Sequence, residues 1–217
     1  LEILTQFNHD NLNMNLIIKG CCDCGHCRQV KLPDFDVLNK LYSDYYHYPS
    51  PLENNFKPER DDVFVELAGS FLKSQARQSK ATSILEVACF DGYALYQFKK
   101  MGYQVCGVDP SDGALIGRKH GLNIHKAFYD PRMFLNRNAT FDAVISRHFL
   151  EHVVEPSEYI EKFKQVLRPN GTLVIEVPNA AYYLSRGLME VFSPQHIQGF
   201  TKHSLSKVLN DAGLSVL

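Results

Sequence analysis

The chain has 217 residues, 45% of them apolar, and a formal net charge of −1. This length is typical of one domain with room for a small addition, and the composition argues against disorder. A net charge near zero without a Lys/Arg stripe disfavours a nucleic-acid partner bound through its phosphates. No apolar run is long enough to cross a bilayer and no signal peptide is visible, so we expect no membrane association and a cytoplasmic location.

Helices and strands are predicted to alternate from residue 61 onward, because apolar residues recur first at helical and then at strand spacing. The predicted helices run from Asp61 to before Thr82, across 95–101, from 114 to 121, around Leu150, across 156–167 and across 205–212. The predicted strands are 84–88, 104–108, 122–125, 143–146, 173–177 and 215–217.

This alternation predicts an α/β fold, a doubly wound and mostly parallel sheet with helices on both faces. We divide the chain into a Cys-rich segment (1–50), a helical lead-in (51–80) and a main domain (81–217). The chain starts at Leu1 rather than Met and stops in a predicted strand, so we expect both ends to be incomplete.

The turn after the strand 84–88 is the most informative segment. In a doubly wound sheet this turn, with an acid at the tip of the next strand, holds a nucleoside. A dinucleotide requires G-x-G-x-x-G, but Ala88 and Phe90 replace the first two glycines and only Gly92 remains. Asp91 would repel a pyrophosphate and suits a cationic ligand such as S-adenosylmethionine.

The predicted cofactor contacts lie at the ends of successive strands. Asp109 is expected to accept the ribose hydroxyls, and Asp91 with Gly92 to lie under the methionine tail, although Asp91 could instead cap the helix. Phe128, followed by Tyr129, is expected to flank the adenine, unless these rings belong to the core. The remaining expected contacts are Glu86, Ala88, Cys89, Pro110, Ser111, Ser146 and Arg147.

Five segments in register resemble the motifs of class I S-adenosylmethionine-dependent methyltransferases. They are 86–93, 107–111, 141–153, 167–179 and the stretch with His196, Phe200-Thr201 and Ser204-Leu205. The resemblance covers the chain from about Ala81 to its end and implies a methyltransferase that uses S-adenosyl-L-methionine.

Within that superfamily, the Cys89-x-Asp91-Gly92-Tyr93 turn resembles the sugar C-methyltransferases, which act on nucleotide-linked deoxysugars. Those enzymes carry an N-terminal zinc-binding segment and a Tyr-x-Tyr-x-Ser stretch, which Cys21–Gly25 and Tyr46–Ser50 resemble. Two features differ from that family. Residues 193–196 are Ser-Pro-Gln-His where the family has Tyr-His-Glu-His, so only His196 is retained, and the family's C-terminal domain is not found in this sequence.

Four of the six cysteines crowd into residues 21–27. Cysteines so close rarely pair with one another, and a C-x-x-C-G turn can present two thiolates to one zinc ion. We predict Cys21, Cys24 and Cys27 as ligands of a structural zinc, with the fourth ligand from His9, Cys22 or outside this sequence. The alternative is a set of free thiols.

The candidates for a general base are His196 and His148, because imidazole can titrate near neutral pH; Tyr182 and Tyr183 are rivals. His148, Glu151 and His152 could share a helix face and hold a metal, a less favoured alternative because Glu151-His152 resembles a pair found in the superfamily without one.

We therefore predict a methyltransferase that acts on a small-molecule or sugar-like acceptor, such as a nucleotide sugar. A non-catalytic module that binds S-adenosylmethionine is the alternative, and a nicotinamide dehydrogenase is disfavoured by the missing glycines. The sequence does not indicate the acceptor atom or the oligomeric state.

Overall fold

The computed structural model describes residues 2–9, 12–32, 34, 36, 49–54, 57–75, 82–189 and 191–217, with side chains from residue 15 onward. The chain forms two compact units. The parallel-sheet unit comprises 48–147 and 161–176, and the antiparallel-sheet unit comprises 1–47, 148–160 and 177–217. These units do not follow the boundaries 1–50, 51–80 and 81–217, and that division stays a prediction.

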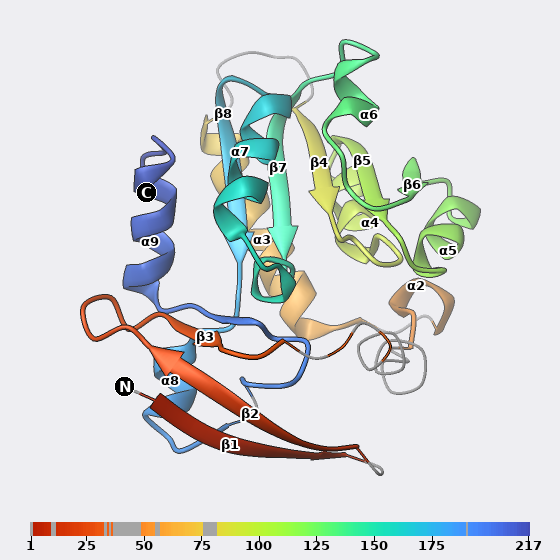
Figure 1. Cartoon of the computed structure of the whole chain (residues 1–217). Helices are drawn as coiled ribbons and strands as arrows, with labels where there is room; N and C mark the ends of the chain where they lie inside the picture. Colours follow the sequence, from red (N-terminus) through yellow and green to blue (C-terminus); the bar gives the residue numbers. More distant parts are fainter. Residues whose placement is uncertain are drawn as a thin grey trace. The chain divides into compact units, whose positions relative to one another are not determined.

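The parallel-sheet unit has five strands in the order β6-β5-β4-β7-β8, and every neighbouring pair is parallel (Figure 1). This confirms the predicted doubly wound fold. The strand order reverses between β4 and β7, so ligands are expected at the carboxyl ends of these central strands. The strands are β4 (Ser83–Val87), β5 (Gln104–Asp109), β6 (Ile124–Lys126), β7 (Phe141–Arg147) and β8 (Leu167–Glu176).

Helices cover this sheet because its central strands are apolar on both faces. On one face, Ile84 of β4 and Ile145 of β7 pack in one cluster with Leu72 and Phe98 from two helices. The rings of Phe134 and Phe141 meet edge to face in a separate aromatic group, 5.3 Å apart. The helices are α2 (Pro51–Asn54), α3 (Glu59–Gln75), α4 (Tyr93–Lys100), α5 (Gly113–Lys119), α6 (Arg132–Leu135) and α7 (Pro156–Val166), the last shared between the units.

The antiparallel-sheet unit contains strands that the sequence analysis did not predict. β1 (Glu2–His9), β2 (Leu12–Gly20) and β3 (Cys27–Gln29) pair in succession, and β3 pairs with β9 (Gln198–Gly199). A small apolar cluster supports them, formed by Leu16, Ile18, Cys27, Ala180, Val191 and Phe192. The unit also contains the 3-10 turn η2 (Leu150–His152), α8 (Ala180–Leu184) and α9 (Lys202–Asp211).

The predicted strand at 215–217 is wrong. These residues follow α9 without strand pairing, and Leu217 is 91% exposed. A strand needs a partner along its edge, and an apolar pattern alone does not supply one. In the described part of the chain, no helix combines the length and the apolar character that a membrane crossing requires.

Candidate functional site

In the turn between β4 and α4, two non-glycine residues adopt the left-handed backbone conformation that glycine usually supplies. Ala88 has φ 60°, Phe90 has φ 51° and Gly92 has φ 75°, so every second residue is left-handed. This conformation costs a non-glycine residue roughly 1–2 kcal/mol. Such strain persists where surrounding contacts hold it and gathers at functional sites. The turn therefore keeps the shape of a nucleotide-binding loop while presenting a methyl group and a phenyl ring.

The amides of this turn are held by β5. Ala88 N–H donates to the carbonyl of Val108 at 2.9 Å, and Phe90 N–H donates to Asp109 Oδ2 at 2.8 Å. Cys89 is buried, and a Cβ added to Gly107 would lie 2.6 Å from its sulfur. These amides anchor the turn to the neighbouring strand, and the predicted ligand contacts of Ala88 and Cys89 stay predictions. The Cys89 side chain points into the core.

Asp109 ends β5 at the expected edge of the sheet and is only 7% exposed. Its Oδ2 accepts from Phe90 N–H, and its Oδ1 accepts from both the amide and the hydroxyl of Ser111. A carboxylate offers about four lone-pair sites, so about one remains for a ribose hydroxyl. Pro110 and Ser111 are exposed beside it.

Asp91 has a different environment from the one predicted. It is 1% exposed, and its carboxylate accepts from Ser50 Oγ at 2.6 Å, Leu52 N at 3.0 Å and Tyr93 N at 3.0 Å. The expected contact with a ligand ammonium stays a prediction, since the three donors described here all belong to the protein and leave about one of the carboxylate's four lone-pair sites. The capping alternative describes its bond to the first turn of α4.

Of the Tyr46–Ser50 stretch, the structure describes Pro49 and Ser50. We expect Ser50→Ala to reduce the free energy of unfolding by about 1.5–3 kcal/mol, because a hydrogen bond to a buried charge is lost. Thermal or urea unfolding measures this, with the exposed Ser74→Ala as control. A Ser50→Ala protein as stable as the wild type would show that Asp91 does not depend on this bond.

Two polar atoms near this edge are buried and lack a hydrogen-bond partner among the described residues: Glu86 Oε2 and Ser146 Oγ. Glu86 is 4% exposed and Ser146 is 1% exposed. They stand on adjacent strands, but Glu86 pairs with Ile145 and Ser146 pairs with Val87, so their side chains leave opposite faces of the sheet. A ligand with a cationic group suits the Glu86 carboxyl, so this residue fits the ammonium group at the amino-acid end of S-adenosylmethionine.

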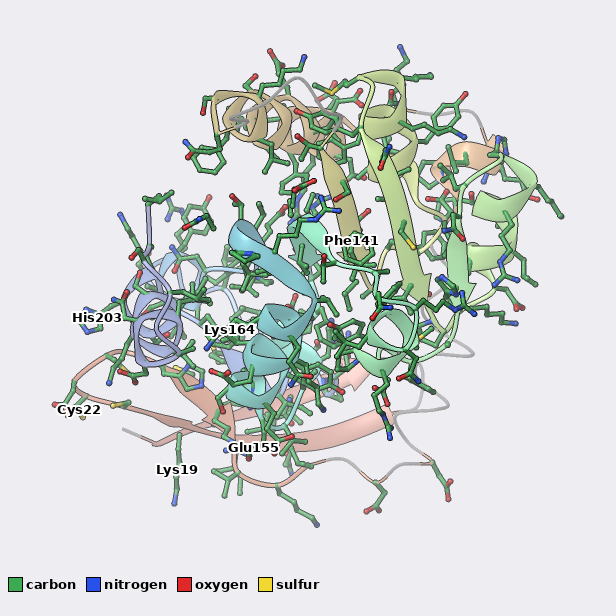
Figure 2. All side chains as sticks on the ribbon, turned by 90° about the horizontal axis from the view of Figure 1, so that it is seen from above. Lys19, Cys22, Phe141, Glu155, Lys164 and His203 are labelled. Atoms are coloured by element: carbon green, nitrogen blue, oxygen red, sulfur yellow. The ribbon has the colours of Figure 1, made fainter. Side chains whose placement is uncertain are left out.

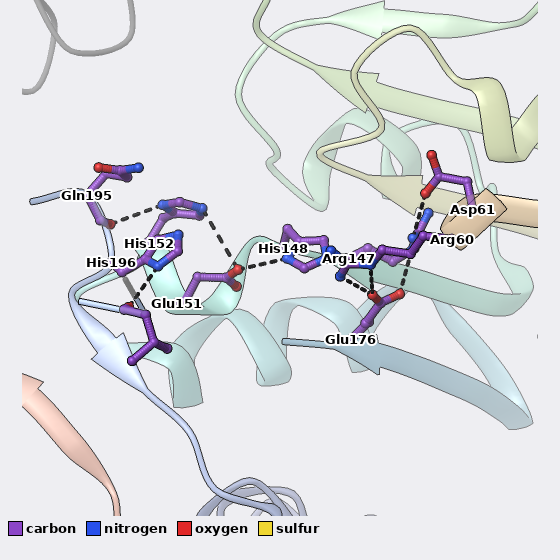
Figure 3. A network of polar contacts seen from close by, with 10 residues as sticks. Arg60, Asp61, Arg147, His148, Glu151, His152, Glu176, Gln195 and His196 are labelled. Carbon is purple, nitrogen blue, oxygen red and sulfur yellow. Dashed lines mark hydrogen bonds and ion pairs between the residues drawn. The ribbon is translucent and has the colours of Figure 1, made fainter. Parts of the chain in front are cut away.

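Arg147, at the end of β7, is held by a network that the sequence analysis missed (Figure 3). Its Nε donates to Glu176 Oε2 at 2.8 Å, its Nη2 donates to Asp61 Oδ1 at 2.7 Å, and its guanidinium stacks 4.0 Å from the Phe64 ring centre. Arg60 also pairs with Glu176. The predicted contact of Arg147 with the cofactor stays a prediction, and its Nε and Nη2 already donate to these two carboxylates.

The two aromatic residues after β6, Phe128 and Tyr129, have different environments. Phe128 is 84% exposed, so its ring is available to a flat ligand, as predicted for adenine. The Tyr129 hydroxyl donates to the Lys162 carbonyl at 2.9 Å, and its ring centre lies 5.4 Å from that of Phe163. Tyr129 therefore belongs to the core, which was the alternative to an adenine contact.

In the antiparallel-sheet unit, His148 directly follows β7 and has a left-handed backbone, φ 47°. Its Nδ1 lies 3.2 Å from Glu151 Oε1, and the Glu151 carboxylate is almost fully buried (Figure 3). The His148 side chain is 34% exposed. A part-exposed imidazole oriented by a buried carboxylate has the arrangement of a general base.

His196, the other predicted base, lies deeper. Its Nδ1 is 2.9 Å from the Val191 carbonyl, and burial lowers its pKa. Its ring lies 4.9 Å from that of His152, whose pKa burial lowers to about 4. Among the described residues, Glu151, His152 and His196 form the one group whose ligand atoms all lie within 4.8 Å and could hold a metal. His196 thus replaces His148 in the metal alternative. Of the rival tyrosines, Tyr182 is half-exposed and stacks with Arg186.

Of the clustered cysteines, Cys21, Cys22 and Cys24 lie in the loop between β2 and β3, where Cys22 points outward, and Cys27 begins β3 (Figure 2). Amides of Cys24 and Asp23 and the Cys24 side chain lower the pKa of Cys21. Cys27 is buried in the apolar cluster, and its thiol donates to the Gly25 carbonyl at 3.6 Å. The structure therefore places Cys21 beside Cys24, but among the described residues these two and Cys27 do not form a group of three ligand atoms close enough to share a metal ion. The described residues do not supply four ligands, and the His9 side chain lies outside them, so zinc stays a prediction.

Comparison with known proteins identifies the family. Residues 59–217 match the family described as "Methyltransferase domain". The chain belongs to this methyltransferase family. The resemblance to class I S-adenosylmethionine-dependent methyltransferases is thereby confirmed at the level of the family.

Two curated relatives share the same name. The "Ubiquinone biosynthesis O-methyltransferase" of Pasteurella multocida is 30% identical over 70% of this chain and 65% of its own length. The mitochondrial protein of that name from Bos taurus is 31% identical over 61% of this chain and 41% of its own length. The chain thus spans less than two thirds of either relative.

Two solved structures share the fold. The plantazolicin methyltransferase BpumL, in complex with a triazolic desmethylPZN analog and SAH, has a TM-score of 0.62 at 18% identity, covering 81% of this chain and 72% of its own. A SAM-dependent methyltransferase from Archaeoglobus fulgidus has a TM-score of 0.54 at 18% identity, covering 83% and 74%. At this identity the likeness concerns the fold alone.

Proposed function

We propose that this chain is an S-adenosylmethionine-dependent methyltransferase that methylates a hydroxyl group of a small-molecule acceptor. The observation that carries the proposal is the row of polar groups at the carboxyl edge of the parallel sheet: Asp109 of β5, Glu86 of β4 and Ser146 of β7, all buried, with unpartnered atoms on the last two. A buried edge of polar groups, two of them carboxyls, suits a cationic nucleoside.

Asp109 would hold the ribose, Phe128 would cover the adenine and Glu86 would face the ammonium group. S-adenosylmethionine supplies an electrophilic methyl group when it is bound. The protein's part is then to hold the acceptor oxygen in line with that methyl carbon and to exclude water, since positioning alone can provide much of the rate.

His148 would take the proton of the acceptor hydroxyl. Its Nδ1 lies 3.2 Å from the Glu151 carboxylate, which would stabilise the imidazolium that results. The relatives named as O-methyltransferases support an oxygen acceptor, whereas the Cys89–Tyr93 turn supports a sugar-like one. Both classes carry hydroxyl groups. The free state of all six cysteines suits a cytoplasmic location.

Calorimetry with S-adenosylhomocysteine and with NAD tests the cofactor assignment. Binding of the first and none of the second is expected, and the reverse would overturn the proposal. A panel of phenols and nucleotide sugars, with release of S-adenosylhomocysteine as the readout, then tests transfer. Cofactor binding without turnover on any acceptor would favour a non-catalytic binding module.

A further inference from the structure

Glu86 is the most unusual carboxyl group in the described part of the parallel-sheet unit. It is 4% exposed, and its Oε2 has no hydrogen-bond partner there. An isolated carboxylate is costly to bury without partners, and buried acids usually stay neutral unless a cation faces them. The charges around Glu86 therefore decide its state.

Those charges are mostly negative. The acids that face Glu86 are Asp61 of α3, Asp91 of the turn and Asp109 of β5, and the Cys89 thiol lies on the same side of the turn. The one cation among the described groups that act on Glu86 is Arg147 of β7, which is already bonded to Asp61 and to Glu176 of β8. Three carboxylates and a shared guanidinium do not compensate a fourth carboxylate.

Two other buried acids of this unit, Asp91 and Asp109, accept several hydrogen bonds from the protein. Asp91 accepts three protein hydrogen bonds and Asp109 also accepts three. Glu86 Oε2 accepts no such bond from the described residues. Burial, reinforced by the three carboxylates and opposed by Arg147, raises the pKa of Glu86 to about 8.

We propose that Glu86 is a proton-exchanging cofactor contact: it is neutral in the free protein and releases its proton to solvent when the ammonium group of the cofactor's amino-acid end binds beside it. The inference rests on the proposed function. The O–H bond of Glu86 breaks, the electron pair stays on the carboxylate, and the carboxylate then pairs with the ligand cation. Cofactor binding and proton release are thereby coupled.

The coupling has a defined sign. Between pH 6 and 8 the free protein holds a proton that the complex lacks, so affinity rises with pH by up to tenfold per unit and levels off near pH 8. Calorimetry with S-adenosylhomocysteine in buffers of different ionisation enthalpy counts the protons directly. We expect release of roughly 0.9 of a proton at pH 7, falling to roughly 0.5 at pH 8, where the free carboxyl is already half ionised.

Two variants separate this inference from a general pH effect. Glu86→Gln keeps the shape and cannot ionise, so it should bind with a pH-independent affinity and release no proton. Asp61→Asn removes one of the facing charges and should move the midpoint of the affinity curve to lower pH. The Asp61 side chain is 28% exposed, so this variant is expected to fold even where Glu86→Gln does not.

Binding of S-adenosylhomocysteine to the wild-type protein without proton release between pH 6 and 8 would overturn the inference and leave the proposed function standing. Proton release that persists unchanged in Glu86→Gln would also overturn it. Absence of binding at every pH would instead overturn the proposed function, and this inference with it.

Discussion

Replacing Asp109 with alanine is expected to weaken binding of S-adenosylhomocysteine by about 2–4 kcal/mol, on the order of 30- to 1,000-fold. About one lone-pair site of its carboxylate is not used by Phe90 and Ser111. One charge-assisted bond to a ribose hydroxyl accounts for about 1.5–3 kcal/mol. The rest comes from the turn, which loses the acceptor of the Phe90 amide. A second ribose hydroxyl would have to displace the hydroxyl of Ser111.

Calorimetry measures this effect, and thermal unfolding separates it from a loss of fold. Asp112→Ala is the matched control, because Asp112 is three residues away and exposed, and it pairs with Lys126 on the surface. Its affinity should equal that of the wild type. An Asp109→Ala protein with an unchanged dissociation constant would remove Asp109 from the cofactor site.

The parallel sheet was predictable because its signals are local. Each strand is an apolar run followed within a few residues by a helix, so β4, its turn and α4 could be recognised from residues 83–100 alone. The chemistry at the strand tips followed from that placement. Asp109 and Ser146 are therefore found at the predicted edge of the sheet.

The contacts that organise the edge were not predictable, because they join distant segments. Asp61 and Arg147 are 86 positions apart, and Ser50 and Asp91 are 41 apart. No local pattern marks either pair. The bonds to Asp91 from Ser50 and Leu52 could not be predicted for this reason, because both donors come from a segment without clear periodicity.

The strands of the antiparallel sheet were missed for a related reason. β3 has three residues and pairs with β9, which has two, across about 170 positions of sequence. Strand pairing is decided by cross-strand contacts more than by propensity. The cysteine cluster drew attention to residues 21–27 as a metal site, whereas Cys27 lies in the apolar cluster.

Replacing His148 with asparagine is expected to lower kcat by about 10²–10⁴-fold, the contribution of a general base. Asparagine tolerates the left-handed backbone at this position, φ 47°, and cannot take up the proton. Binding of S-adenosylhomocysteine should stay close to that of the wild type. Steady-state rates with an acceptor identified by the panel measure the change in kcat, and calorimetry measures the affinity for S-adenosylhomocysteine.

Two further variants show whether His148 or another histidine is the general base. His203→Asn changes an exposed histidine on α9 and should leave kcat unchanged. His196→Asn tests the rival base, whose Nδ1 lies against the Val191 carbonyl and whose pKa is lowered by burial. If His148→Asn retains the wild-type kcat while His196→Asn loses it, the proton is taken by His196. The part-exposed His148, held by the buried Glu151, would then act only in orienting the loop after β7.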